Sequence, residues 1–302
     1  MHVLITGGTG MIGRRLVNHL IKHGHLVTVV SRQPYRPAHL PAKIYFEQWD
    51  GATAKGWGQR LEEVDAIINL AGAGLADARW TDERKKKIVD SRKRAGEAIV
   101  EAVRAAQNKP KVLIQSSGVG YYGTSLDAAM TESSPPGNDF LAEVCKAWEA
   151  STKAVEEMGV RRVITRSGVV LDPQGGALPK MVLPFRLFAG GPVGSGRQWL
   201  PWIHYYDEVE AVRFLIEEPS ISGPVNLTTP QPIRNREFAK AVGRVLKRPA
   251  FAPAPGPILK LIFGEMSTVL LEGQQVLPAR LEANRFKFKF PEIEGALRDL
   301  LT

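Results

Sequence analysis

The sequence has a single cysteine and no long hydrophobic segment. Cys145 is the only cysteine in 302 residues, so an intrachain disulfide and a cysteine-based metal site are excluded, and a reducing compartment is the simplest inference. No apolar run approaches the roughly 20 residues that a membrane-spanning helix needs. The N-terminus, Met1 to Ile5, lacks a basic region and a cleavage site, which predicts a strand rather than a signal peptide. We therefore expect a cytoplasmic protein without membrane contact.

Positive charge is in excess. Lys and Arg total 40 against 31 Asp and Glu, a formal net charge of +9. Such an excess suits nucleic acid, a membrane surface or an anionic small molecule, and it equally suits a solvated surface. The densest basic cluster runs from Arg84 to Arg94, and no recognised nucleic-acid-binding motif accompanies it. We expect no nucleic-acid partner and no metal site.

Short apolar runs alternate with helical patterns over the first two thirds of the chain. This pattern predicts an α/β fold of the Rossmann type, a doubly wound parallel sheet with helices on both faces. The expected strands are Val3–Thr6, Leu26–Val30, Ile44–Phe46, Ala66–Leu70, Val112–Gln115 and Arg162–Thr165. The expected helices are Met11–His23, Thr81–Gln107, Cys145–Met158 and Asp207–Glu217.

The composition of the chain changes after Arg166, where Gly and Pro become frequent. We expect a dinucleotide-binding domain over residues 1–165, to which residues 202–228 return. A smaller mixed α/β domain on the substrate side is expected over residues 166–201 and 229–302. Its expected helices are Arg236–Leu246, Pro257–Leu271 and Ile293–Leu301.

A glycine-rich loop, Gly7 to Gly13, follows the first expected strand and precedes the first helix. Gly7 permits a tight turn, Gly10 lets the backbone approach a pyrophosphate, and Gly13 lets helix and strand pack closely. Free backbone N–H groups and the helix dipole then favour phosphate charge. This is the context that a dinucleotide fingerprint requires. The predicted cofactor contacts here are Gly7, Thr9, Gly10, Met11 and Ile12.

The end of the second strand distinguishes the two nicotinamide dinucleotides. An NAD site usually has Asp or Glu there, which holds the ribose 2′-hydroxyl. Here the strand ends in Ser31 and Arg32, without a carboxylate. A hydroxyl beside a guanidinium suits a 2′-phosphate, because arginine offers a fixed fork of donors. The sequence therefore predicts NADP(H) as the cofactor.

Two further segments are candidate cofactor contacts. Leu70, Ala71 and Gly72 follow the fourth strand, where small residues either let a ligand approach the backbone or simply form the exit of the strand. Arg92 lies on the apolar stripe of the helix Thr81–Gln107. A cation that faces the sheet needs an anionic partner, which a cofactor phosphate or a nearby carboxylate would provide.

These segments resemble the extended short-chain dehydrogenase/reductase superfamily in its opening fingerprint, its fourth-strand motif and its fifth-strand serine segment. A narrower resemblance, over nearly the whole chain, is to the atypical epimerase family branch with its small C-terminal domain. The motifs that carry it include Ser31-Arg32, Gly120-Tyr121-Tyr122-Gly123, Trp148-Glu149, Gly190–Gly196 and Pro201–His204. The resemblance implies NADP(H) binding through Ser31, Arg32, Leu70, Ala71 and Arg92, with Val170 beside the nicotinamide.

The usual catalytic pair of that superfamily is missing. The superfamily uses Tyr-x-x-x-Lys on the helix after the fifth strand, where the lysine lowers the tyrosine pKa. Counted back from Glu149, these positions hold Leu141 and Cys145. Ser117 lies where the superfamily places its substrate-polarising hydroxyl, and it equally suits backbone capping at a strand end. Tyr121 could supply a phenol, or it could be a packing aromatic.

Two functions follow from these residues. The first is an NADP(H)-dependent oxidoreductase or a nucleoside-sugar-type epimerase, whose small polar or sugar-like substrate is unknown. The second is a non-catalytic NADPH-binding sensor or scaffold, which the missing pair favours. The sequence assigns neither a substrate nor an oligomeric state.

Overall fold

Seven parallel strands form the centre of the computed structural model, which describes residues 1–302. Their order across the sheet is β12–β7–β5–β4–β1–β2–β3. The strands are β1 (His2–Thr6), β2 (Leu26–Ser31), β3 (Tyr45–Gln48), β4 (Ala66–Asn69), β5 (Val112–Gly118), β7 (Arg161–Ser167) and β12 (Gly223–Leu227). This architecture confirms the Rossmann-type fold. The strand order reverses between β1 and β4, and such sheets bind ligands at the carboxyl ends of the strands beside that reversal.

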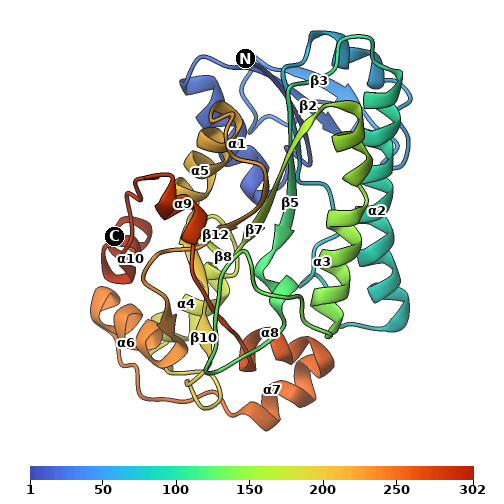
Figure 1. Cartoon of the computed structure of the whole chain (residues 1–302). Coiled ribbons are helices and arrows are strands. Elements are labelled where there is room, and N and C mark those ends of the chain that lie inside the picture. Colours follow the sequence, from blue (N-terminus) through green and yellow to red (C-terminus); the bar gives the residue numbers. More distant parts are fainter.

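Helices cover both faces of the sheet (Figure 1). α1 (Met11–Lys22) and α5 (Tyr205–Glu217) lie on one face, and α2 (Asp82–Ala105) and α3 (Phe140–Ala150) lie on the other. Strand β1 shows the cause: Val3 and Ile5 are buried on the α1 side, whereas Leu4 is buried on the α2 side. Successive side chains of a strand point to opposite faces, so a fully apolar strand requires cover on both.

The remaining elements include a smaller layer with its own apolar cluster. α4 (Leu178–Arg186), α6 (Asn235–Leu246) and α10 (Ile293–Leu301) pack around this cluster, which contains Phe185 and Trp202. A separate three-stranded sheet contains β8 (Val169–Asp172), β9 (Gly175–Gly176) and β11 (Trp202–His204). The other short elements are η1 (Gly58–Glu63), η2 (Val119–Tyr122), β6 (Ala129–Met130), η3 (Lys153–Met158), β10 (Trp199–Leu200), β13 (Ile233–Arg234), α7 (Gly256–Phe263), η4 (Gly264–Ser267), α8 (Thr268–Leu271), β14 (Gln275–Val276) and α9 (Ala279–Ala283).

The segment after β11 returns to the main sheet. α5 packs against α1, and β12 becomes the edge strand beside β7. β11 itself pairs with β8 in the small sheet. His204, at its end, is buried, and its Nδ1 accepts the backbone N–H of Tyr206 at 3.0 Å, which caps α5. This is the geometry of a structural histidine. The expected domain boundaries stay a prediction.

Two expected helices differ from those in the structure. α3 begins at Phe140 rather than Cys145, because the Asp139 carboxylate accepts the Ala142 N–H at 2.8 Å and caps the helix there. It ends at Ala150, and a 3-10 helix completes the segment as far as Met158. The expected helix Pro257–Leu271 is interrupted at Gly264, whose φ is +60°, a conformation that an α-helix cannot contain.

The glycine hairpin β8–β9 is fastened to α1. The Arg15 guanidinium donates two hydrogen bonds to the buried Asp172 carboxylate, at 2.7 and 2.8 Å, and Arg14 donates to the Gln174 carbonyl oxygen at 3.0 Å. The helix that follows the glycine loop is therefore held against the smaller layer. Each helix of the structure is too short or too polar to cross a lipid bilayer.

Candidate functional site

The loop between β1 and α1 is shaped for close approach of a ligand. Gly7 has a φ of +74°, which residues with side chains rarely adopt. A Cβ on Gly13 would lie 2.4 Å from the Gly7 carbonyl oxygen, so the first turn of α1 can pack on the loop only with glycine at that position. No side chain caps α1 at Gly10, which leaves the N–H groups of the first turn for an anionic ligand.

A pocket of about 230 Å³ opens beside this loop. Its walls come from the glycine loop, the end of β2, the segment after β3 and the segment after β4. They are formed by Gly7, Thr9, Gly10, Val30, Ser31, Arg32, Trp49, Gly51, Leu70, Ala71, Gly72, Ala73 and Ser91. No carboxylate is among these residues. A phosphate bound here would therefore meet no like charge from the pocket wall.

The end of β2 presents the groups that were predicted to select NADP(H). The Ser31 hydroxyl accepts the Gln33 N–H at 3.2 Å, which leaves its own proton to donate. Arg32 is exposed and forms no ion pair within the chain. A Cβ on Gly51 would lie 3.1 Å from Arg32 Cδ, so the glycine gives the arginine side chain room. Trp49 and Gly51 had no recognisable sequence signal.

Arg92 lies behind the pocket wall rather than in it. Its Nη1 donates to the carbonyl oxygens of Ala73 (2.9 Å) and Ile88 (3.0 Å), and its guanidinium lies 4.7 Å from the ring centre of Trp148. Burial lowers the pKa of Arg92 to about 10, so the group is still charged at neutral pH. No carboxylate pairs with it, and its buried Nε has no partner. The sequence left a cofactor phosphate and a nearby carboxylate as possible partners of Arg92, and the structure has no such carboxylate.

Besides Arg92, three predicted contacts lie outside the pocket. The Met11 side chain lies against the β8–β9 hairpin, where its Cγ is 3.3 Å from the position of a Cβ on Gly175. Ile12 packs against the core of the α1 face, and Val170 is buried in β8. Their contact with a cofactor stays a prediction.

A buried polar network lies at the end of β5. The Ser117 hydroxyl donates to Glu149 Oε1 at 2.7 Å. Arg166 donates two hydrogen bonds of 2.9 Å to the same carboxylate. Ser117 therefore gives its only proton to Glu149, and it cannot donate that proton to a substrate at the same time.

The network continues to two adjacent tyrosines. Arg166 Nη1 donates to the Tyr122 hydroxyl at 3.1 Å, and that hydroxyl donates to Asn226 Oδ1 at 2.6 Å. The Arg166 guanidinium also stacks on the ring of Tyr121, 3.4 Å from its centre. Tyr122 is thus fully engaged. Tyr121 is only half-buried, and its hydroxyl makes no hydrogen bond within the chain.

Leu141 and Cys145 face the same region from α3. The Cys145 thiol donates to the Gly118 carbonyl oxygen at 3.5 Å, and Leu141 Cβ lies 3.0 Å from the position of a Cβ on Gly120. Burial raises the pKa of the Cys145 thiol to about 11. A thiol in this state is a poor nucleophile at neutral pH.

A second buried carboxyl group lies beside this network without a charged partner. The Ser167 hydroxyl donates to Glu208 Oε1 at 2.7 Å, and Glu208 Oε2 has no partner. Burial raises the pKa of Glu208 to about 7. The folded protein therefore binds this proton more tightly than the unfolded chain does.

Replacing Glu208 with glutamine should stabilise the protein at pH 8 more than at pH 5. A raised carboxyl pKa contributes stability at low pH, and that contribution is lost as the pH rises from the unfolded value towards about 7. The difference in unfolding free energy between variant and parent should grow by roughly 2–3 kcal/mol over this window. Thermal unfolding from pH 5 to pH 8 measures it. Glu157→Gln, at an exposed site, is the control, and parallel pH profiles for parent and Glu208→Gln would contradict the expectation.

Residues 3–227 match the NAD dependent epimerase/dehydratase family, and residues 254–300 match a domain of unknown function, DUF1731. The first match spans most of the chain and includes the glycine loop and all of the seven-stranded sheet except His2. The chain belongs to the NAD dependent epimerase/dehydratase family. The resemblance seen in the sequence, including the small C-terminal domain, is confirmed.

Relatives of this epimerase-family chain align with it over its full length. The epimerase family protein YfhF of Bacillus subtilis is 39% identical, covering 100% of this chain and 98% of its own. The crystal structure of the human epimerase family protein SDR39U1 with NADPH has a TM-score of 0.88 and 36% identity, and the match covers 99% of both chains. The nucleoside-diphosphate sugar epimerase of Corynebacterium glutamicum has a TM-score of 0.80 and 30% identity, but this chain covers only 58% of it.

Proposed function

We propose that this epimerase-family chain is an NADP(H)-dependent oxidoreductase of a small polar or sugar-like substrate. The observation that carries the proposal is the pocket at the β1–β4 reversal, which combines a glycine cradle with Ser31 and Arg32 and contains no carboxylate. A human relative binds NADPH on the same fold. Bound NADP(H) would supply or accept a hydride. The chain would position the cofactor and the substrate and would supply or accept the proton.

Different residues of the pocket would bind different parts of the cofactor. The N–H groups at the start of α1 would hold the pyrophosphate. Ser31 and Arg32 would hold the 2′-phosphate, and Gly72 would let the dinucleotide lie against the backbone. Arg92 would act through the pocket wall, because its unpaired buried charge favours an anion on the other side of Gly72 and Ala73.

Tyr121 is the proposed proton donor and acceptor. Its hydroxyl is the one free phenol beside the end of β5, since that of Tyr122 is engaged with Arg166 and Asn226. The stacked Arg166 guanidinium holds the Tyr121 ring in place, 3.4 Å from its centre. Ser117 would then be a positioning residue, which holds Glu149 and, through it, Arg166.

A non-catalytic NADPH sensor is the second candidate. The commitment of the Ser117 proton to Glu149 favours it, as do Leu141 and Cys145 at the positions where the superfamily has its tyrosine and lysine. A sensor would keep the same cofactor pocket and lack turnover.

Turnover of NADPH separates the two candidates. The protein is incubated with NADPH and a panel of nucleoside-diphosphate sugars and small carbonyl compounds, and the reduced-nicotinamide absorbance is followed. We expect oxidation of NADPH by the parent, a loss of about 100-fold or more in Tyr121→Phe, and none in Gly10→Asp. A Cβ on Gly10 would meet only the Gly7 carbonyl oxygen, at 3.3 Å, so the loop must shift slightly to admit the side chain, whose carboxylate would repel the pyrophosphate.

An epimerase returns its hydride and leaves the absorbance unchanged. NMR of each mixture therefore tests for an isomer of the added sugar. Bound NADPH with neither oxidation nor isomerisation across the panel would contradict the catalytic proposal and favour the sensor.

A further inference from the structure

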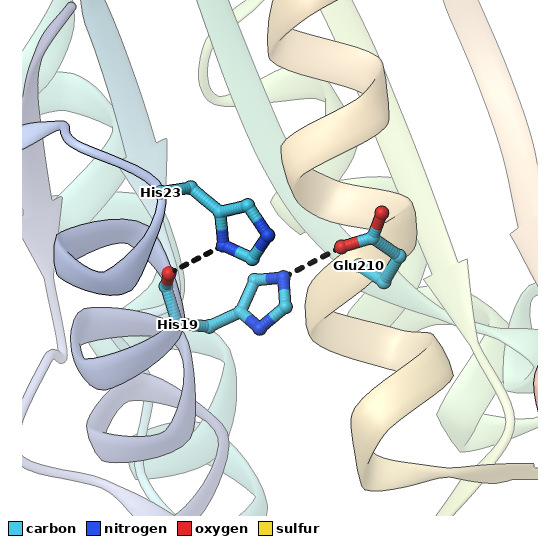
Figure 2. Close-up of side chains that lie close together, drawn as sticks. All are labelled: His19, His23 and Glu210. Atoms are coloured by element: carbon cyan, nitrogen blue, oxygen red, sulfur yellow. Dashed lines mark hydrogen bonds and ion pairs between the residues drawn. The ribbon is translucent and has the colours of Figure 1, made fainter.

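Two histidines and a glutamate meet between α1 and α5 (Figure 2). His19 lies on α1, His23 is the residue that follows its last turn, and Glu210 points at them from α5. His19 is buried, Glu210 is half-buried and His23 is exposed. One ligand atom from each residue lies within 4.8 Å of the others. The cluster is separate from the cofactor pocket, because none of the three residues lines it.

The hydrogen bond of His23 prepares this ring for a metal. Its Nδ1 lies 2.9 Å from the His19 carbonyl oxygen, and a carbonyl oxygen can only accept. Nδ1 therefore carries the ring proton, and Nε2 is left with a free lone pair. Metal-binding histidines are commonly held in this way, with the distal N–H on a backbone carbonyl.

Glu210 is also held in place. Its Oε2 lies 2.6 Å from His19 Nε2, and both of its oxygens accept hydrogen bonds from Arg213. Arg213 donates to Glu217 as well. Two carboxylates therefore surround one guanidinium, so with neutral histidines the local charge is negative. A divalent cation would meet a net attraction despite the nearby arginine.

We propose that His19, His23 and Glu210 bind a divalent transition-metal ion of the zinc class, which links α1 to α5. Two imidazole nitrogens and one carboxylate oxygen are a ligand set that zinc uses, with a water in the fourth position. The exposure of His23 leaves room for that water. The ion replaces the proton that lies between His19 Nε2 and Glu210, and the ring of His19 then carries its proton on Nδ1.

The movement that binding requires is small. Ligand atoms around a tetrahedral zinc ion lie roughly 3.4 Å apart, given metal–ligand distances of about 2.0–2.2 Å. The 2.6 Å contact between His19 and Glu210 must open by under about 1 Å. The exposed ring of His23 must move inward by no more than about 1.4 Å from the 4.8 Å limit of the cluster. Side-chain rotations can supply both changes.

A neighbouring pair shows what distinguishes this cluster. His25 Nε2 lies 3.0 Å from Glu217 on the same face of the molecule. That pair belongs to no such cluster and joins α5 to the residue before β2. His23 differs from His25, since its only side-chain hydrogen bond is to the His19 carbonyl oxygen and it forms no ion pair with a carboxylate. Its place over His19, with ring centres 4.4 Å apart, is therefore the feature that points to a metal.

Zinc titration of the full-length, tag-free protein tests the proposal. Calorimetry should show one Zn²⁺ bound per chain, and saturating Zn²⁺ should raise Tm because it binds only the folded state. His23→Ala should weaken Zn²⁺ binding by about 10-fold to 100-fold or more, since outer-shell changes alone cost that much. Its fold is not in question, because His23 is exposed. Mg²⁺, which prefers oxygen ligands, should bind far more weakly.

His39→Ala is the matched control, because it removes an exposed histidine far from the cluster in sequence. It should bind Zn²⁺ as the parent does. Glu210→Gln should weaken binding as His23→Ala does, which separates a three-ligand site from a histidine pair. The proposal is overturned if the parent binds no Zn²⁺, or if His23→Ala and His39→Ala bind it equally well.

Discussion

Replacing Arg32 with glutamate is expected to weaken NADPH binding by about 100-fold while NADH binding changes little. Charge-assisted hydrogen bonds to a phosphate are worth roughly 1.5–3 kcal/mol, and each 1.4 kcal/mol is tenfold in affinity. A carboxylate at this position adds repulsion of the 2′-phosphate, and it can accept a hydrogen bond from the 2′-hydroxyl of NADH. Fluorescence titration of reduced nicotinamide with both cofactors measures the two changes.

The control for Arg32→Glu is Lys43→Glu, which changes the net charge equally at an exposed residue outside the pocket. It should leave both affinities close to those of the parent. Equal losses of NADPH and NADH affinity in Arg32→Glu would contradict the assignment of the 2′-phosphate. They would indicate general damage to the pocket instead.

Removing one member of the Glu149–Arg166 pair is expected to lower the free energy of unfolding by about 3–5 kcal/mol. The two side chains are 10% and 5% exposed, and their contact is bidentate. Glu149→Gln leaves a buried guanidinium without its carboxylate, and Arg166→Met leaves the carboxylate without its cation. The double variant should lose less than the sum of the single losses, because it leaves neither charge unpaired.

Urea unfolding of the parent, the two single variants and the double variant measures this coupling. Arg298→Met is the comparison, since it removes an ion pair with Glu294 in which the arginine is 68% exposed. That change should cost less than about 1 kcal/mol. Single variants at the buried pair that cost no more than Arg298→Met would show that solvent reaches the network.

The cofactor loop and the end of β2 could be predicted because their requirements are local. The turn after β1 needs a positive φ at Gly7 and an absent side chain at Gly13, and both requirements appear as glycines within seven residues. Ser31 and Arg32 follow directly from where β2 ends. The apolar strands likewise predicted a sheet that is covered on both faces.

The position of Arg92 and the network of Ser117 depend on partners that are distant in sequence. Helical periodicity placed Arg92 on the inner face of α2, but it could not show that Gly72 and Ala73 separate the guanidinium from the pocket. The superfamily motif predicts that the Ser117 hydroxyl polarises a substrate. In the fold this hydroxyl instead donates to Glu149, 32 residues away in the sequence. Arg166, one of three arginines in strand β7, was the one available signal for that network.

The single thiol of the molecule, that of Cys145, can report on the movement of α3 relative to β5. Cys145 is held between α3 and β5, and burial keeps it protonated at neutral pH. A thiol reagent needs both access and a thiolate, so it reacts only when α3 separates from β5. Each chain can react once, because it has no other cysteine. The labelling rate therefore measures how often α3, which also contains Glu149, separates from β5, and no engineered probe is needed.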